Sequence, residues 1–432
     1  MGRVVGVTIE SMAFQGNAVA RVNGKVVFVP QAIKGETAQV EVVDEKKDYG
    51  IGVLRQLTLS SPFRVSPPCP YFSLCGGCQW QHIAPEAQVE FKKEILEETL
   101  KRLGGLQEIP PVAVFPSPLA YGYRVRVQLK GKQGRVGYYA KRTHRIIPIE
   151  HCPIAHPLIN QIIPLFQDCP RLFSPVEEVE VNVSPEEGRG ILVLHPFPAA
   201  PKIEKELPDF LRHHPLLKGV AVARKGKLDL FGETDLTFTV CFPKNGQSRN
   251  VRLRTSPASF FQIHPEQNQN LVQTVIELGA LKDGERLLDL YAGIGNLTLP
   301  LASTTRDVTG IEENRTAVMD ARNNARANGM EGCRFICGKV EEVLKSASLK
   351  KPDVILLDPP RSGCKEAVAH IVALRPKRIV YVSCDPATFS RDLRLFGESG
   401  YTLERLTLID LFPQTYHMEI VGLLLAGCLA KQ

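Results

Sequence analysis

The sequence lacks the features of a secreted or membrane-spanning protein. Its first residues contain no apolar segment followed by a cleavage site, and the longest late apolar stretch, residues 420–430, is short and interrupted. A helix that crosses a bilayer needs about 20 predominantly apolar residues. We therefore expect a cytoplasmic protein with no membrane partner, and nothing in the chain indicates an obligate protein partner.

A strong charge bias is also missing. The formal net charge of +7 permits an anionic partner without requiring one. The contents of apolar residues (44%) and charged residues (23%) are typical of soluble globular proteins. A chain of 432 residues is too long for one ordinary core, so we expect two or three domains.

The 11 cysteines lack the regular spacing of a secreted disulfide framework. One tight group, Cys69, Cys75 and Cys78, has two glycines before its last member, and Cys152 is a candidate fourth ligand. Four thiolates suit either zinc or an iron–sulfur cluster, and the spacing alone does not choose between them. The second close cysteine pair of a zinc ribbon is absent. In a radical methyltransferase, three close cysteines hold the cluster and one iron stays open for the methyl donor. Here Cys152 would occupy that fourth position.

The pattern of strands and helices predicts an α/β protein in three parts. Five short β-patterned segments within residues 1–60 predict a small closed barrel of the oligonucleotide-binding type. Residues 61–250 read as a central β-rich domain that holds the cysteine group, and a helix near residues 85–104 is expected to pack on the carboxyl-terminal domain. Residues 251–432 alternate strands with helices, which predicts a Rossmann-like, doubly wound parallel sheet.

A nucleoside pocket is predicted where the first strand of that alternating region ends. Gly293, Gly295 and Asn296 follow the strand, and the two glycines let the backbone approach a ligand closely. Thr298 stands where a dinucleotide fingerprint has its third glycine, which weakens a hydride-transfer interpretation. Glu312 ends the next strand, where a carboxylate can accept both ribose hydroxyls. Together these residues favour S-adenosylmethionine.

Cys384 ends the apolar run of residues 378–383 and is followed by proline at a helix start, so its thiol is expected at the carboxyl edge of the sheet. Asp358 ends a neighbouring run, and Glu419 precedes the last one. A thiolate that adds to carbon 6 of uracil makes carbon 5 nucleophilic toward a sulfonium methyl group, and a base then removes the carbon 5 proton. His417 and Glu419 also resemble part of a deaminase zinc pattern, but the required cysteine pair does not follow.

These motifs resemble the RNA (uracil-5-)-methyltransferase family. The resemblance is carried by Phe261-Gln262, the segments 289–296 and 310–312, Asp358-Pro-Pro-Arg, residues 382–388 and residues 415–419. It implies that Cys384 is the nucleophile and Glu419 the base. The methyl donor contacts that it implies are Gln262, Tyr291, Glu312 and Asp358. Lys339 falls where many members carry an acidic or amide residue near the adenine, so that contact is left unassigned.

The resemblance also bears on the remaining parts of the chain. Residues 1–58 resemble the TRAM barrel of many members of the family. The branch that acts on 23S ribosomal RNA carries the cysteine pattern as a [4Fe-4S] site, whereas typical bacterial transfer-RNA members lack it. The implied cluster ligands are Cys69, Cys75, Cys78 and Cys152.

An RNA-binding surface is predicted in residues 121–145, which contain no acidic residue. Cations on alternating strand positions can contact phosphates, and tyrosines can stack on unpaired bases. The candidates are Arg124, Arg126, Lys130, Lys132 and Arg142. The resemblance thus implies methylation of a uridine at carbon 5 in 23S ribosomal RNA. The alternatives are a transfer-RNA methyltransferase and a noncatalytic iron–sulfur protein that binds RNA.

Overall fold

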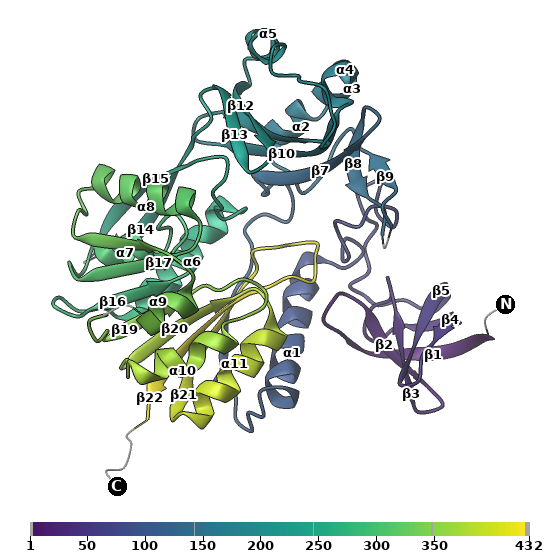
Figure 1. Ribbon diagram of the computed structural model, residues 1–432. Coiled ribbons are helices and arrows are strands. Elements are labelled where there is room, and N and C mark those ends of the chain that lie inside the picture. The colour runs from purple at the N-terminus through teal and green to yellow at the C-terminus, as the bar shows by residue number, and fades with distance from the viewer. Residues whose placement is uncertain (1–2, 142, 245, 347–348, 428–432) are drawn as a thin grey trace.

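The computed structural model describes residues 3–427, apart from residues 142, 245 and 347–348 (Figure 1). Arg142, one of the predicted RNA contacts, and Cys428 lie outside the described residues. Within the described part of the chain, no helix is both long enough and apolar enough to cross a membrane.

The amino-terminal part is the predicted closed barrel, with the strand order β1-β2-β3-β5-β4. Side chains of alternating strand residues fill it, and Gly52 is needed because a Cβ there would lie 2.3 Å from a methyl carbon of Val40. The strands are β1 (Arg3–Met12), β2 (Ala18–Val22), β3 (Lys25–Val29), β4 (Thr37–Glu45) and β5 (Tyr49–Leu59).

A buried carboxylate fastens this barrel to the segment that follows it. Glu36 is fully buried and accepts hydrogen bonds from the backbone N–H groups of Ile33 (2.8 Å) and Ser61 (3.2 Å). The guanidinium of Arg64 donates to both carboxylate oxygens, at 2.6 and 2.7 Å. Burial alone would raise the pKa of Glu36, but these bonds hold the pKa below its ordinary value.

The central domain is a seven-stranded mixed sheet in the order β13-β12-β11-β10-β7-β8-β9. Short helices cover one face of it (Figure 1), and three of these helices, α2, α3 and α4, were not predicted because each is six residues or shorter. The strands are β7 (Arg126–Lys132), β8 (Arg135–Tyr139), β9 (Ile146–Pro148), β10 (Val176–Ser184), β11 (Arg189–Pro196), β12 (Leu217–Arg224) and β13 (Lys227–Gly232), and the helices are α2 (Pro157–Ile162), α3 (Leu165–Asp168), α4 (Pro170–Phe173) and α5 (Leu207–His213).

The carboxyl-terminal domain is the predicted Rossmann-like sheet, in the order β18-β17-β16-β19-β20-β22-β21-β6. Strands β16 to β20 are parallel, and β22 enters antiparallel between β20 and β21. The strands are β16 (Leu287–Leu290), β17 (Val308–Glu312), β18 (Cys333–Cys337), β19 (Val354–Leu357), β20 (Arg378–Ser383), β21 (Tyr401–Ile409) and β22 (Glu419–Ala426), and the helices are α6 (Pro265–Gly279), α7 (Thr298–Ala302), α8 (Arg315–Ala327), α9 (Val340–Ser346), α10 (Lys365–Ala373) and α11 (Pro386–Glu398).

The boundaries between the last two parts differ from the sequence expectation. Strand β6 (Val112–Phe115) is the edge strand of the catalytic sheet, and α1 (Pro85–Arg102) packs beside α11 (Figure 1). Residues 85–115 therefore belong structurally to the catalytic sheet, because the apolar side of α1 needs a buried partner. The expected boundary after residue 250 also falls inside the hairpin of β14 (Leu236–Lys244) and β15 (Gln247–Thr255).

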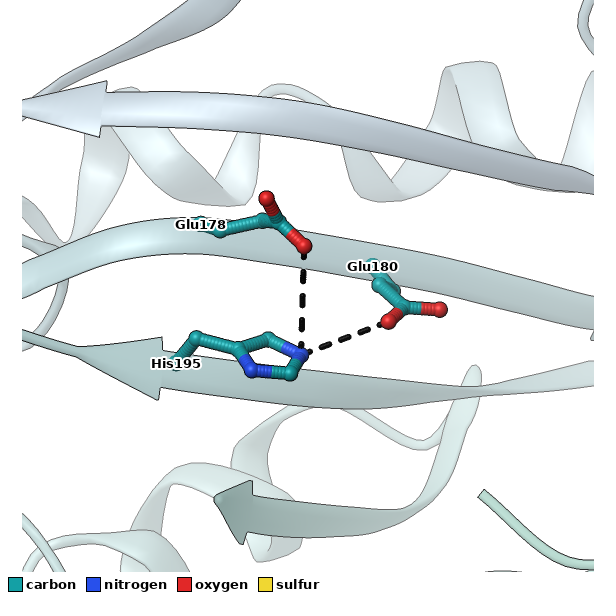
Figure 2. A group of neighbouring side chains, drawn as sticks. All are labelled: Glu178, Glu180 and His195. Atoms are coloured by element: carbon teal, nitrogen blue, oxygen red, sulfur yellow. Dashed lines mark hydrogen bonds and ion pairs between the residues drawn. The ribbon is translucent and has the colours of Figure 1, made fainter. Parts of the chain in front are cut away.

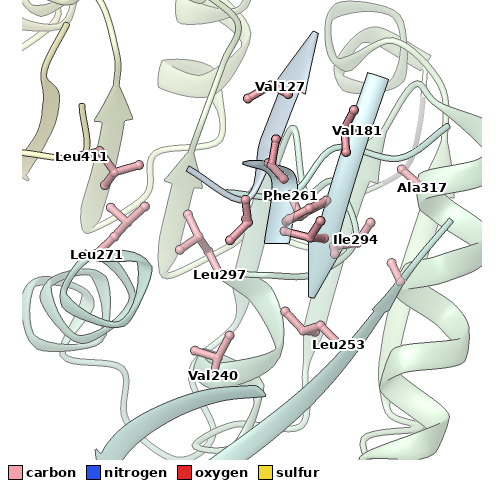
Figure 3. Packing of buried hydrophobic residues seen from close by; sticks show 14 of the residues in the cluster. Val127, Val181, Val240, Leu253, Phe261, Leu271, Ile294, Leu297, Ala317 and Leu411 are labelled. Atoms are coloured by element: carbon pink, nitrogen blue, oxygen red, sulfur yellow. The ribbon is translucent and has the colours of Figure 1, made fainter. Parts of the chain in front are cut away.

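Two amide side chains, one within α8 and one at its C-cap, hold that hairpin against the catalytic domain. Asn328 and Asn324 each exchange two hydrogen bonds of 2.8 to 3.0 Å with the backbone of Arg252 and Arg254, respectively. These amides form hydrogen bonds with the backbone groups at the edge of β15, as the backbone of a neighbouring strand would. The hydrophobic core then runs without a break from the central sheet, at Val127 and Val181, through the hairpin to α6 and α8 (Figure 3).

Candidate active site

The expected nucleophile and base lie at neighbouring strand ends. Cys384 directly follows β20, and Glu419 is the first residue of β22. In the antiparallel register, Ser383 faces Ile420. Cys384 comes one residue after Ser383 and Glu419 one residue before Ile420, and the charge of Glu419 acts on the Cys384 thiol, so the two residues are neighbours at this sheet edge. The sheet therefore brings together two residues that are far apart in the sequence.

Burial and neighbouring charges shift both of these groups. Burial, followed by the charges of Glu419 and Asp358, raises the pKa of the Cys384 thiol to about 12, while Arg361 opposes this rise. Burial and the charge of Asp358 also raise the pKa of the Glu419 carboxyl well above its ordinary value. A carboxylate with such a pKa is a strong base once it is ionised.

Helix α11 begins directly after Cys384. The side chain of Asp385 caps the helix, with Oδ1 accepting hydrogen bonds from the N–H groups of Ala387 and Thr388, both at 2.9 Å. Pro386 occupies the first turn. The sulfur is therefore held at the positive end of a helix dipole, as the sequence indicates.

Three residues of the glycine-rich loop after β16 have left-handed backbone conformations. Tyr291, Gly293 and Gly295 have φ values of 68°, 53° and 89°, and a Cβ on Gly295 would lie 3.0 Å from Leu299. The Glu312 carboxylate accepts hydrogen bonds from the N–H of Gly293 (3.0 Å) and of Asn314 (2.8 Å). Each of its oxygens keeps a lone pair for a ribose hydroxyl.

Other polar groups brace the same loop. Asn296 and Asn268 exchange two amide hydrogen bonds of 2.8 Å. Thr298, which stands at the position of the missing glycine, donates from its hydroxyl to the buried carboxylate of Asp289. The Tyr291 hydroxyl donates to Oε1 of Glu341 at 2.9 Å. Sequence reasoning missed Glu341, although it lies two residues after the unassigned Lys339 position.

Four carboxyl groups gather around these strand ends: Asp289, Glu312, Asp358 and Glu419. Burial, and then the charges of Asp358 and Glu312, raise the pKa of Asp289 to about 8, although its bond from Thr298 opposes this. The pKa of Asp358 is raised in the same way, by burial and the charge of Glu312. Such crowding favours a bound cation.

Gln262 is half-buried and follows Phe261, which packs in the cluster that contains Ile294 (Figure 3).

All four predicted cluster cysteines line one cavity of about 210 Å³. Cys75 forms a β-bridge with Ala140, and the backbone N–H of Cys152 donates to Oδ1 of Asn160 at 2.8 Å. Burial, together with the charges of the other thiols, raises the pKa of Cys75 to about 11 and that of Cys78 to about 12. Thiols shifted in this direction ionise readily only when a cation binds them.

The predicted RNA contacts on the central sheet are engaged with acidic partners. Lys130 and His195 both face Glu178 in the strand register, and Lys130 is ion-paired with Glu178. Arg126 pairs with Glu180 at 2.5 Å, and Nε2 of His195 lies 3.3 Å from the same carboxylate (Figure 2). These carboxylates already have cationic partners, so this cluster is an ion-pair network rather than a metal site.

The remaining candidates differ in exposure. Lys132 is exposed, whereas Arg124 is half-buried and its Nε donates to the carbonyl of Arg126 at 3.0 Å. The alternation of residues along β7 predicts that Arg126 and Lys130 share one face of the sheet, and they do. It could not reveal that Glu178 and Glu180 lie beside them on β10.

A groove of about 860 Å³ lies where the three parts of the chain meet. No aspartate or glutamate is among the described residues that line it. These residues come from the barrel (Gln15, Gly16, Asn17, Pro30, Gln31), the cysteine loop (Gly76, Gly77, Gln79), the central sheet (Gln128, Lys130, Tyr138, Tyr139, Ala140, Lys141, Thr143, His144) and the catalytic domain (Tyr416). The charges of Arg361 and Asp385 act on both Tyr416 and Cys384, so this end of the groove lies near the candidate active site.

Comparison with known proteins gives two matching family models. Residues 220–427 match the tRNA (Uracil-5-)-methyltransferase model, and residues 1–54 match the TRAM domain. An uncharacterized RNA methyltransferase of Aquifex aeolicus is 35% identical, covering 96% of this chain and 97% of that protein. A 23S rRNA (uracil(1939)-C(5))-methyltransferase of Photorhabdus laumondii is 32% identical, covering 97% of this chain and 96% of that protein.

A solved structure shares the fold over almost the whole length. The tRNA (uracil-54, C5)-methyltransferase of Pyrococcus abyssi, in complex with S-adenosyl-L-homocysteine, superposes with a TM-score of 0.74 at 24% identity. The match covers 98% of this chain and 100% of that one. The methyltransferase fold is thereby established for this chain.

Proposed function

This chain belongs to the RNA (uracil-5-)-methyltransferase family, and from that membership we propose that it methylates carbon 5 of a uridine in 23S ribosomal RNA. The observation that carries the proposal is that Cys384 and Glu419 lie at adjoining strand ends, next to the crowded carboxylates. A thiol facing a buried base is the arrangement that covalent activation of uracil requires.

The donor pocket is proposed to lie over the glycine-rich loop. Glu312 would accept the ribose hydroxyls of S-adenosylmethionine, and the backbone at Gly293 and Gly295 would approach the ligand closely. Tyr291, Asn296, Asp358 and Gln262 are the remaining proposed contacts. S-adenosylmethionine supplies the methyl group as a sulfonium, and the negative charge of the surrounding carboxylates complements that cation.

The proposed reaction runs between the two opposed side chains. The Cys384 thiolate forms a bond to carbon 6, and the electron pair of the ring double bond moves into the carbon 4 carbonyl as an enolate. Carbon 5 then takes the methyl group as the sulfur–methyl bond breaks. The Glu419 carboxylate accepts the carbon 5 proton, the double bond reforms, and the carbon 6–sulfur bond breaks to restore the thiolate.

The substrate is proposed to lie along the groove at the junction of the three parts. Its lining offers the aromatic rings of Tyr138, Tyr139 and Tyr416 and, among the described residues, no aspartate or glutamate to repel phosphates; Lys130 also lines it, but Glu178 already pairs with this cation. Carbon 6 of a stacked uridine is out of reach of a thiol at a sheet edge, so the target base would leave its stack. The half-buried, ion-paired Arg126 is better suited to shaping the sheet than to contacting RNA.

The cysteine cavity is proposed to hold a [4Fe-4S] cluster. Cys69, Cys75, Cys78 and Cys152 would supply all four ligands, so the cluster would be closed and structural. The gathering of four thiols around one cavity supports a metal centre here, and the family resemblance favours the cluster over a zinc ion. The cluster would pin the cysteine loop to the central sheet.

The proposed target is tested with RNA from a strain that lacks this gene. Incubation with the protein and S-adenosylmethionine carrying a labelled methyl group should label 23S ribosomal RNA at carbon 5 of uridine, as located by nucleoside mass spectrometry. Label in transfer RNA alone would identify the alternative substrate. Binding to RNA without any transfer would indicate a noncatalytic protein.

A further inference from the structure

The loop of residues 410–418, which leads into Glu419, is held by a helix that lies more than 300 residues earlier in the chain. We propose that Gln88 and Lys92 of α1 are positioning residues for the Glu419 base, which they control by fixing this loop. The inference rests on the proposed function, because it takes Glu419 as the base that removes the carbon 5 proton.

Lys92 anchors the start of the loop. It is fully buried, and its Nζ lies 2.6 Å from Oδ1 of Asp410 and 3.1 Å from the carbonyl oxygen of Phe412. A buried ion pair is weak evidence for stability, because desolvation offsets much of the attraction, but it restricts how two elements can dock. The contacts of Lys92 with Asp410 and Phe412 fix the position at which the backbone leaves β21 and turns toward Glu419.

Gln88 anchors the middle of the same loop. Its Oε1 accepts a hydrogen bond from the N–H of Gln414 at 2.8 Å, and its Nε2 donates to Oε1 of Gln414 at 3.0 Å. Gln414 is fully buried and has a φ of 68°, an unfavourable conformation for a residue with a side chain. The surroundings must therefore impose this turn, and the amide of Gln88 does so directly.

The cysteine loop holds the other side of the turn. The carbonyl oxygen of Gln414 accepts hydrogen bonds from the backbone N–H groups of Gln79 (3.2 Å) and Trp80 (3.0 Å), directly after Cys78. Gln88 also donates to the carbonyl of Trp80 at 3.1 Å. The turn before Glu419 is therefore clamped between α1 and the segment that carries three of the cluster cysteines.

Cys384 is supported mainly by elements other than the clamped loop. It is held by β20 and by the Asp385 cap of α11, and neither contains a residue of that loop, although β20 also pairs with β22 and α11 packs beside α1. Loosening the clamp should therefore displace Glu419 while Cys384 still reaches carbon 6. Proton removal, the last chemical step, should slow more than methyl transfer, and the methylated RNA should remain bonded to the enzyme.

The test measures two quantities in single-turnover reactions of Lys92→Met and Gln88→Leu with an unmodified 23S ribosomal RNA transcript. Methyl transfer to RNA should fall by less than about threefold, whereas release of the RNA from its covalent complex should slow by on the order of 100-fold, the effect of a displacement of about 1 Å. The complex is seen as protein that retains RNA in a denaturing gel. Lys92→Arg, which keeps the charge, should restore release.

Arg378→Met is the matched control. It removes a largely buried ion pair with Glu285 at the opposite end of β20. It should lower the melting temperature without accumulating the complex. The inference is overturned if Lys92→Met and Gln88→Leu release RNA as fast as wild type, or lose transfer and release in parallel. If Glu419→Gln itself accumulates no complex, the proposed function fails instead.

Discussion

The thiol of Cys384 should react slowly in the free protein and accelerate with pH far beyond the range of an ordinary cysteine. Its pKa of about 12, against an ordinary value near 9, leaves about 1000-fold less thiolate at neutral pH. A more basic thiolate is intrinsically more nucleophilic, by a Brønsted slope of about 0.4 to 0.5. The net effect is alkylation roughly 30- to 60-fold slower than that of an unperturbed thiol.

The assay is alkylation by iodoacetamide between about pH 6 and about pH 9, with the Cys384 peptide quantified by mass spectrometry. The rate should rise about tenfold per pH unit over the whole range, since the thiol titrates above it. Arg361→Met should slow alkylation, because the Arg361 charge lowers this pKa, and Asp358→Asn should accelerate it, because the Asp358 charge raises the pKa. A rate that levels off below about pH 9 would refute the reasoning.

Three further outcomes follow from individual contacts. Glu312→Gln should weaken binding of S-adenosylmethionine by about tenfold, or about 1.4 kcal/mol, in titration calorimetry, because the charged acceptor between two backbone donors is lost; unchanged affinity would remove Glu312 from the pocket. Cys152→Ser should lower the iron content per chain, whereas the exposed Cys337→Ser should not; equal iron in both variants would argue against the four-cysteine site. Glu36→Gln should lower the free energy of unfolding by about 2 kcal/mol near neutral pH in urea denaturation. Because the folded-state pKa of Glu36 is lowered, its contribution is present above the ordinary value of 4.5 and is lost as the pH falls through the folded-state pKa, so the difference between wild type and variant should shrink there; a constant difference would contradict this account.

Much of the catalytic domain could be predicted because its signals are local. Each strand of the alternating region is a short apolar run, and the carboxyl ends of parallel strands meet at one edge. That rule alone brought the Gly293 loop, Asp358 and Cys384 to one place. The opposition of Glu419 required one more fact, the antiparallel entry of β22 beside β20.

The parts that escaped prediction depend on contacts between distant segments. Lys92 reads in the sequence as one of several charges on an amphipathic helix, and its partner Asp410 is 318 residues away. Lys130 reads as a free cation until the register of β7 and β10 sets Glu178 opposite it. Glu341 became visible only when the fold brought α9 next to Tyr291.

The central claim is transient bonding of Cys384 to the target uridine, and trapping that bond tests it most directly. Glu419→Gln, incubated with S-adenosylmethionine and unmodified 23S ribosomal RNA, should form a complex that survives denaturation. After nuclease and protease digestion, mass spectrometry should find a methylated uridine joined to the peptide that contains Cys384. Quantitative methyl transfer by Cys384→Ala, or a nucleotide joined to any other residue, would contradict the account.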